Sequence, residues 1–75
     1  MISIFKTNID SHHDLNQIKP YLNALKADLK WTIDLFDCDK ILRVDSSVNK
    51  NEEIILAVNK MGYICENLET FYSAP

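Results

Sequence analysis

The sequence predicts an α+β fold with the element order β-α-β-β-α-β. Three observations predict it: short runs in which apolar and polar residues alternate, two longer runs with apolar residues at helical spacing, and the order of these runs along the chain. Two amphipathic helices in this order can cover one face of a four-stranded antiparallel sheet. The core then lies between helices and sheet, and the other sheet face stays open to solvent or to a partner.

The first predicted strand spans residues 1–9, which are rich in β-branched and aromatic residues with polar ones between them. Ile2 and Ile4 favour one face of this strand. Phe5 and Ile9 favour the other, so the pattern leaves its facing open.

The first predicted helix begins at Ser11, because Ser11 and Asp14 have the Ser-x-x-acid spacing of a capping box. An apolar stripe of about three turns follows: Leu15, Ile18, Leu22 and Leu25. Pro20 interrupts this pattern, since it lacks the backbone N–H and its ring crowds the carbonyl four residues earlier. We expect either a bend within residues 16–20 or a helix whose regular part starts late.

Residues 31–35 and 41–45 each alternate apolar and polar side chains, and an acidic connection lies between them, so they predict a hairpin. A second helix is predicted from about residue 50 to residue 61. The run Asn-Lys-Asn-Glu at residues 49–52 is typical of a capped start, and Gly62 can end the helix in the left-handed conformation.

Residues 63–68 predict a short last strand, and residues 70–75 are expected to form a loosely held tail. The chain is therefore predicted to be one ferredoxin-like domain of residues 1–69 followed by that tail. The expected shared core consists of apolar residues from the helices and the hairpin: Leu15, Ile18, Leu22, Leu25, Ile33, Leu35, Ile54, Val58 and Met61.

Composition limits the function. With 75 residues, an enzyme with a deep, water-excluding pocket is not expected. A net charge of −3 without a basic run disfavours nucleic acid as a partner, and no apolar run approaches the ~20 residues of a membrane span. Lys6 interrupts the first apolar residues too early for a signal peptide. Two cysteines without a CxxC motif are typical of reduced thiols, so we expect a cytoplasmic protein.

Several segments share a further pattern. Phe-Lys-Thr-Asn-Ile at residues 5–9 leads into the first helix, residues 29–35 supply the second strand, and Asp-Lys-Ile-Leu at residues 39–42 returns the hairpin. Residues 54–63 follow the pattern Ile-x-x-Ala-Val-x-x-x-Gly-Tyr. Across residues 3–68 the chain resembles the heavy-metal-associated (HMA) domain family of copper chaperones, mercury-binding proteins and metal-pumping ATPases. The resemblance implies the same fold.

The family's metal motif is absent. HMA domains bind soft ions such as Cu(I) through a Met-x-Cys-x-x-Cys loop after the first strand. Here Ile9 stands at the Met position, and Ser11 and Asp14 stand at the two Cys positions. A hydroxyl and a carboxylate are weak ligands for Cu(I), so we expect that binding of Cu(I) and Hg(II) has been lost.

The same loop contains the residues of an alternative metal site: Asp10, His12, His13 and Asp14. Imidazole and carboxylate suit Zn(II), Cu(II) or Ni(II). However, adjacent side chains in the first turn of a helix point about 100° apart and do not readily converge on one ion. Two solvated histidines behind a helix cap are the favoured interpretation, and a weak divalent site is the alternative.

Other candidate residues carry structural explanations. Cys38 and Cys65 have no partner at motif spacing, and Cys65 is expected to be a small apolar filler. The acidic string Asp34, Asp37 and Asp39 lacks the glycine and the distant Glu of a calcium loop, which favours a solvated turn. The aromatic pair at residues 71 and 72 is expected to dock either on its own domain or on another chain.

These observations favour a small non-enzymatic protein-interaction or adaptor domain without cofactors, whose partner is another protein and which uses the open sheet face or the former metal loop. The alternative is weak divalent-metal binding through His12, His13 and nearby carboxylates. Enzymatic activity has no support in the sequence, because no nucleophile and base stand at a recognisable spacing. RNA binding ranks last, since the chain lacks basic charge. The sequence does not indicate the oligomeric state.

Overall fold

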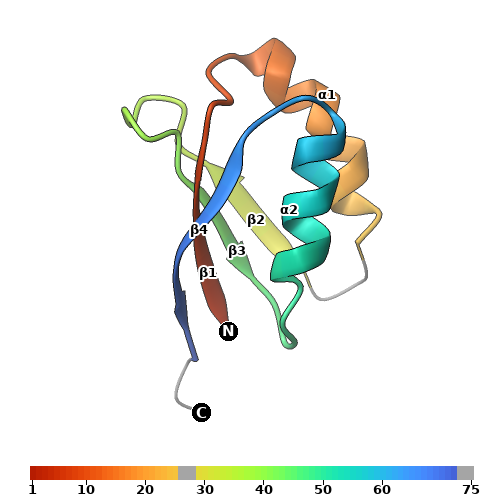
Figure 1. The fold of residues 1–75 in the computed structure, drawn as a ribbon, viewed down its shortest axis with the longest axis vertical. Helices are drawn as coiled ribbons and strands as arrows, with labels where there is room; N and C mark the ends of the chain where they lie inside the picture. Colours follow the sequence, from red (N-terminus) through yellow and green to blue (C-terminus); the bar gives the residue numbers. More distant parts are fainter. Residues whose placement is uncertain (26–28, 73–75) are drawn as a thin grey trace.

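A computed structural model describes residues 1–25 and 29–72 of the protein. The elements are β1 (Ile2–Thr7), α1 (His12–Asn23), β2 (Lys30–Ile33), β3 (Leu42–Asp45), α2 (Asn51–Lys60) and β4 (Cys65–Phe71). The strands form one antiparallel sheet in the order β2-β3-β1-β4, and both helices cover one face of it (Figure 1). The predicted α+β, ferredoxin-like fold is confirmed.

The facing of β1, which the sequence pattern left open, is clear in the structure. Phe5, Thr7 and the following Ile9 are buried on the side of the helices. Ile2 and Ile4 lie on the open face of the sheet, where Ile4 pairs with a residue of β3 on one side and of β4 on the other. β1 is therefore a central strand whose odd positions belong to the core.

The helix α1 begins directly after Ser11, which is its N-cap. The backbone N–H of Asp14 donates to Ser11 Oγ at 3.1 Å, as the capping-box spacing predicts. The helix continues through Pro20 to Asn23, so the expectation that its regular part starts late is wrong. Pro20 is tolerated because it and Asn16, whose carbonyl loses its helical donor, are exposed, and water can reach that carbonyl.

The hairpin of β2 and β3 is shorter than predicted. Its register pairs Lys30 with Asp45 and Ile33 with Leu42, and no ladder extends to residue 35. One more backbone bond follows the last pair, because the Asp34 N–H donates to the Ile41 carbonyl at 2.9 Å. The chain then turns, and Asp34 Oδ1 accepts a hydrogen bond from the Phe36 N–H at 3.0 Å.

The helix α2 ends as the sequence predicts. Gly62 has φ +91°, its N–H donates to the Asn59 carbonyl, and the Tyr63 N–H donates to the Val58 carbonyl, which together form a Schellman motif. The start differs, because Lys50 occupies the N-cap position without a side-chain cap, and Asn49 Oδ1 accepts from the N–H of Asn51 at 2.9 Å. Within the part of the chain that the structure describes, no helix is long and apolar enough to cross a membrane.

The core lies between the helices and the sheet. Of the predicted core, four residues are fully buried: Ile18, Leu22, Ile54 and Val58. The other predicted residues are partly buried and pack against this core: Leu15, Leu25, Ile33, Leu35 and Met61. The strands contribute core residues outside that prediction: Phe5, Ile9, Leu42, Val44 and Cys65. The two central strands, β1 and β3, therefore supply much of the buried apolar surface.

The last strand extends further than predicted. β4 runs from Cys65 to Phe71, so Thr70 and Phe71 belong to the sheet rather than to a tail that begins after residue 69; residues 73–75 of that tail lie outside the described residues. The side chain of Asn51 at the start of α2 accepts from Ser3 Oγ at 2.6 Å and donates to Thr70 Oγ1 at 3.0 Å. These two bonds tie the end of β4 to β1 and α2.

Candidate functional site

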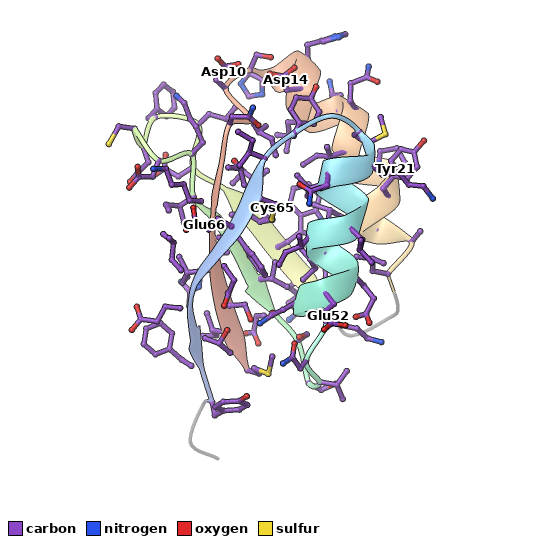
Figure 2. The ribbon with its side chains drawn as sticks, in the orientation of Figure 1. Asp10, Asp14, Tyr21, Glu52, Cys65 and Glu66 are labelled. Carbon is purple, nitrogen blue, oxygen red and sulfur yellow. The ribbon has the colours of Figure 1, made fainter. Side chains whose placement is uncertain are left out.

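The loop between β1 and α1 contains the residues that the sequence singled out for metal binding. Asp10, His12 and His13 are exposed, whereas Ser11 and Asp14 are partly buried. Asp10 and Asp14 lie close together at one end of the molecule (Figure 2). The loop is therefore an accessible, acidic surface at the N-terminus of α1.

The side chains of Ser11 and Asp14 already have partners. Ser11 Oγ caps the helix, and Asp14 Oδ1 accepts a hydrogen bond from the Tyr63 hydroxyl at 2.7 Å. Tyr63 lies just after α2, so this bond joins the two connections at this end of the fold. A second bond does the same, because the Ile64 N–H donates to Asn8 Oδ1 at 2.8 Å. Nothing in the sequence pattern indicates these two bonds, since their partners are 49 and 56 positions apart.

The hydrogen bond between Asp14 and Tyr63 shifts the pKa values of the two groups in opposite directions. The Tyr63 hydroxyl, and to a lesser extent groups of Asp10 and Ser11, lower the pKa of Asp14 below its ordinary value of 3.8. The Asp14 carboxylate, helped by burial and by the charge of Asp10, raises the pKa of Tyr63 above 10.0. Across neutral pH the pair is thus a carboxylate that accepts from a phenol.

The structure does not bring three of the candidate metal ligands within reach of one ion. Among the described residues, the group of His, Cys, Asp and Glu side chains close enough to share an ion is Asp37, Cys38 and Asp39, whose ligand atoms lie within 4.8 Å of one another. Asp10, His12, His13 and Asp14 form no such group. Any divalent ion at the first loop would need these side chains to rearrange.

The acidic connection between β2 and β3 is a hydrogen-bonded turn. Asp37 Oδ1 accepts from the Asp39 N–H at 2.8 Å, and the Asp37 carbonyl accepts from the Lys40 N–H at 3.1 Å. The turn is fastened to β1, since Thr7 donates through its N–H to the Asp39 carbonyl and through Oγ1 to the Lys40 carbonyl. Carboxylates that form turns in this way explain the acidic string structurally. The proximity of Cys38 to both carboxylates follows from their adjacency in the chain, which the sequence already shows.

The two cysteines lie in different environments. Cys38 is exposed, whereas Cys65 is buried between β4 and the helices, and neither is in a disulfide (Figure 2). Burial raises the pKa of the Cys65 thiol to about 12, so it is protonated and unreactive at neutral pH. Cys65 is the apolar filler that the strand pattern predicts.

Exposed apolar side chains gather on β4 and its flanks. Ile64, Leu68, Phe71 and Tyr72 are 61%, 48%, 48% and 77% exposed, which is half of the large exposed apolar side chains among the described residues. β4 is an edge strand with β1 as its single neighbour in the sheet. We call residues 64–72 the β4 edge.

A second apolar surface lies on the outer side of the helices. It is a shallow groove between the C-terminal half of α1 and α2, and we call it the interhelical groove. Tyr21 and Leu25 line one side of it, and Leu56 and Ala57 line the other. Its polar rim includes Glu53 and Lys60.

No protein-family model, curated protein or solved structure matches the chain. The resemblance to HMA domains therefore remains a prediction from the sequence.

Proposed function

We propose that the chain is a non-enzymatic protein-interaction module, derived from an HMA-like metal-binding domain, that binds an extended segment of another protein along the β4 edge. The observation that supports the proposal most strongly is the concentration of exposed apolar side chains on residues 64–72. Isolated exposed apolar residues are common, but four within nine residues along one sheet edge are a local concentration of apolar surface.

An edge strand offers a second source of affinity. Its outward-facing N–H and C=O groups can pair with an added strand, while neighbouring side chains provide selectivity. The pairing of β4 with β1 shifts register opposite Ile4 and Phe5, which leaves Leu68 without a partner in β1. Such a bulge interrupts the edge, so it favours a short bound segment over indefinite strand addition.

The charges on the open face specify the chemistry of the partner. Glu66, Glu69 and Phe71 pair with Lys6, Ile4 and Ile2, the positions of β1 that face away from the helices. An added strand would place its own side chains beside these three on the same face. Basic side chains on this face would lie next to the glutamates, and the aliphatic stem of a basic side chain would cover Phe71. The apolar residues of the added strand would then lie on its other face. The expected partner is therefore an extended segment with alternating basic and apolar residues.

The groups at the former metal loop support a role without catalysis. Ser11 Oγ serves as a cap, Asp14 accepts from Tyr63, and Cys65 is buried and protonated. The missing thiols at positions 11 and 14 support the loss of soft-metal binding. Both cysteines are unpaired, which supports a reducing compartment such as the cytoplasm.

A binding assay with a designed peptide tests the proposal. A fluorescently labelled peptide that alternates valine and lysine should bind the protein, as measured by fluorescence anisotropy, and one that alternates valine and glutamate should not. Leu68→Ser should weaken binding of the lysine peptide about tenfold, because it removes an apolar contact at the centre of the β4 edge. Glu66→Lys should weaken it about threefold to fivefold, as expected for an exposed charge pair.

The matched control is Glu52→Lys, which changes the net charge equally but lies on α2, away from Glu66 (Figure 2). It should change the affinity by less than about twofold. Equal losses in Glu52→Lys and Glu66→Lys would show that the peptide responds to net charge alone, and the proposal would then fail. Failure of the lysine peptide to bind at millimolar concentration would also contradict it.

A further inference from the structure

The outer face of α2 carries a short pattern that the core does not use. Ile54 and Val58 point into the core and are fully buried. Glu53, Leu56, Ala57 and Lys60 follow the spacing i, i+3, i+4, i+7 and form the opposite face, with Leu56 67% exposed. The Leu56 side chain therefore has little of its apolar surface buried within its own domain.

The pattern is complementary to itself when the helix is reversed. If two copies of α2 lie antiparallel, with a two-fold axis midway between residues 56 and 57, Leu56 of each copy faces Ala57 of the other. In the same register Glu53 of each copy faces Lys60 of the other. Size and charge therefore match at every pair: a large side chain meets a small one, and an anion meets a cation.

We propose that the protein forms a symmetric homodimer through this face, with α2 packed antiparallel against α2 of a second copy. Tyr21, which is 46% exposed and lies on the outer side of α1, and Leu25 extend the contact along the interhelical groove (Figure 2). The contact uses the helical layer, and the β4 edge lies in the sheet. The dimer thus presents two β4 edges for partners and does not depend on whether those edges bind a peptide.

The size of the face sets the expected strength. Helices of 12 and 10 residues are about 18 and 15 Å long, and two packed helices are about 20 Å wide. Such a face is at the small end for protein interfaces, so we expect a reversible dimer with a Kd of about 100 µM rather than an obligate one.

Sedimentation equilibrium over micromolar to millimolar protein concentrations measures this dimer. Leu56→Glu should raise the Kd at least tenfold, because it places two carboxylates beside the two-fold axis. The fold should persist, since Leu56 lies outside the core, and circular dichroism checks this. Phe36→Glu is the matched control, because Phe36 is 99% exposed in the β2–β3 connection and should leave the Kd within twofold.

Charge exchange tests the register. Glu53→Lys and Lys60→Glu should each weaken self-association about tenfold, because each places like charges opposite one another twice. A mixture of the E53K chain and the K60E chain should form a heterodimer at least as strong as the wild-type dimer, because both inter-helix pairs then have opposite charges. The doubly exchanged chain E53K/K60E should again form a homodimer.

Several results would overturn this inference. One is a wild-type protein that remains monomeric at millimolar concentration. Another is a dimer that Phe36→Glu weakens as much as Leu56→Glu does. Loss of the dimer in Leu68→Ser but not in Leu56→Glu would place the contact on the β4 edge instead. A mixture of E53K and K60E chains that showed no preferential heterodimer would exclude the antiparallel register.

Discussion

The β1–α1 loop and the β4 edge are the two surfaces where a partner could be recognised, and they differ in how their groups are satisfied. In the loop, Ser11 caps α1 and Asp14 accepts from Tyr63. On the β4 edge, large apolar side chains are exposed and one side of the strand has no neighbour. Groups that already have partners inside the fold contribute to stability, whereas unsatisfied surface is available for binding. The loop groups are thus explained by their bonds within the fold, and we propose the β4 edge as the surface that binds a partner.

The largest expected effect comes from introducing two thiols into the loop. Ser11→Cys combined with Asp14→Cys should give one-to-one Cu(I) binding that survives glutathione, because two thiolates at this spacing suit a soft ion. The wild-type protein should lose Cu(I) to the same competitor. Ser11→Ala with Asp14→Ala controls for loss of the cap. Tight Cu(I) binding by the wild-type protein under reducing conditions would contradict the assignment of the loop as structural.

The next effect concerns the core on which both surfaces rest. Leu22 is a fully buried residue of α1, so Leu22→Ala should lower the free energy of unfolding by ~2–5 kcal/mol. Leu56→Ala, on the exposed side of the helical layer, should cost less than about 0.5 kcal/mol. Urea denaturation of both variants gives the comparison. Similar losses for the two would mean that the helices are not packed as described.

These core positions show which features of the fold can be predicted from the sequence alone. Helical spacing predicts that Ile18, Leu22, Ile54 and Val58 face the core, because that periodicity is local. It does not predict that β4 continues to Phe71, where the contacts are between residues far apart in the chain: Asn51 accepts from Ser3 Oγ and donates to Thr70 Oγ1. Nor does alternation predict the turn after Asp34, where Asp34 Oδ1 accepts from the Phe36 N–H.

For the candidate surfaces too, local features can be predicted from the sequence and long-range contacts cannot. The missing thiols at positions 11 and 14 are visible in the sequence, but the partner of Asp14 is not, because Tyr63 is 49 positions away. The exposure of Leu56 could have been predicted, since it lies off the stripe of Ile54 and Val58. The order of the strands, which makes β4 an edge, requires the three-dimensional fold.

Removing the Tyr63 hydroxyl tests the structural role of the loop through the pH dependence of the free energy of unfolding. Because the pKa of Asp14 is lowered in the folded state, its contribution is present above the ordinary value of 3.8 and is lost as pH falls through the lowered pKa. Because the pKa of Tyr63 is raised, its contribution is present below 10.0 and is lost as pH rises through the raised pKa. The stability difference between wild type and Tyr63→Phe should therefore be constant near neutral pH and shrink at both extremes. Urea denaturation across the pH range measures it, and a difference that grew in acid would contradict the hydrogen bond.

The smallest effect is expected for the exposed histidines. Zn(II), Cu(II) and Ni(II) should bind no tighter than about micromolar, which corresponds to ~8 kcal/mol, because the candidate ligands do not converge and Asp14 would have to leave Tyr63. His12→Ala with His13→Ala should leave stability unchanged within about 0.5 kcal/mol. Calorimetry that found one-to-one nanomolar binding, abolished by this double substitution, would make the loop a metal site.

Backbone amide shifts recorded while the valine–lysine peptide is added to ¹⁵N-labelled protein test the central claim most directly, because they report on both surfaces in one titration. The account predicts that the largest shifts occur in β4 and the neighbouring residues of β1, and that amides of the β1–α1 loop and the outer face of α2 stay unchanged. The largest shifts at residues 10–14, with β4 unaffected, would contradict it.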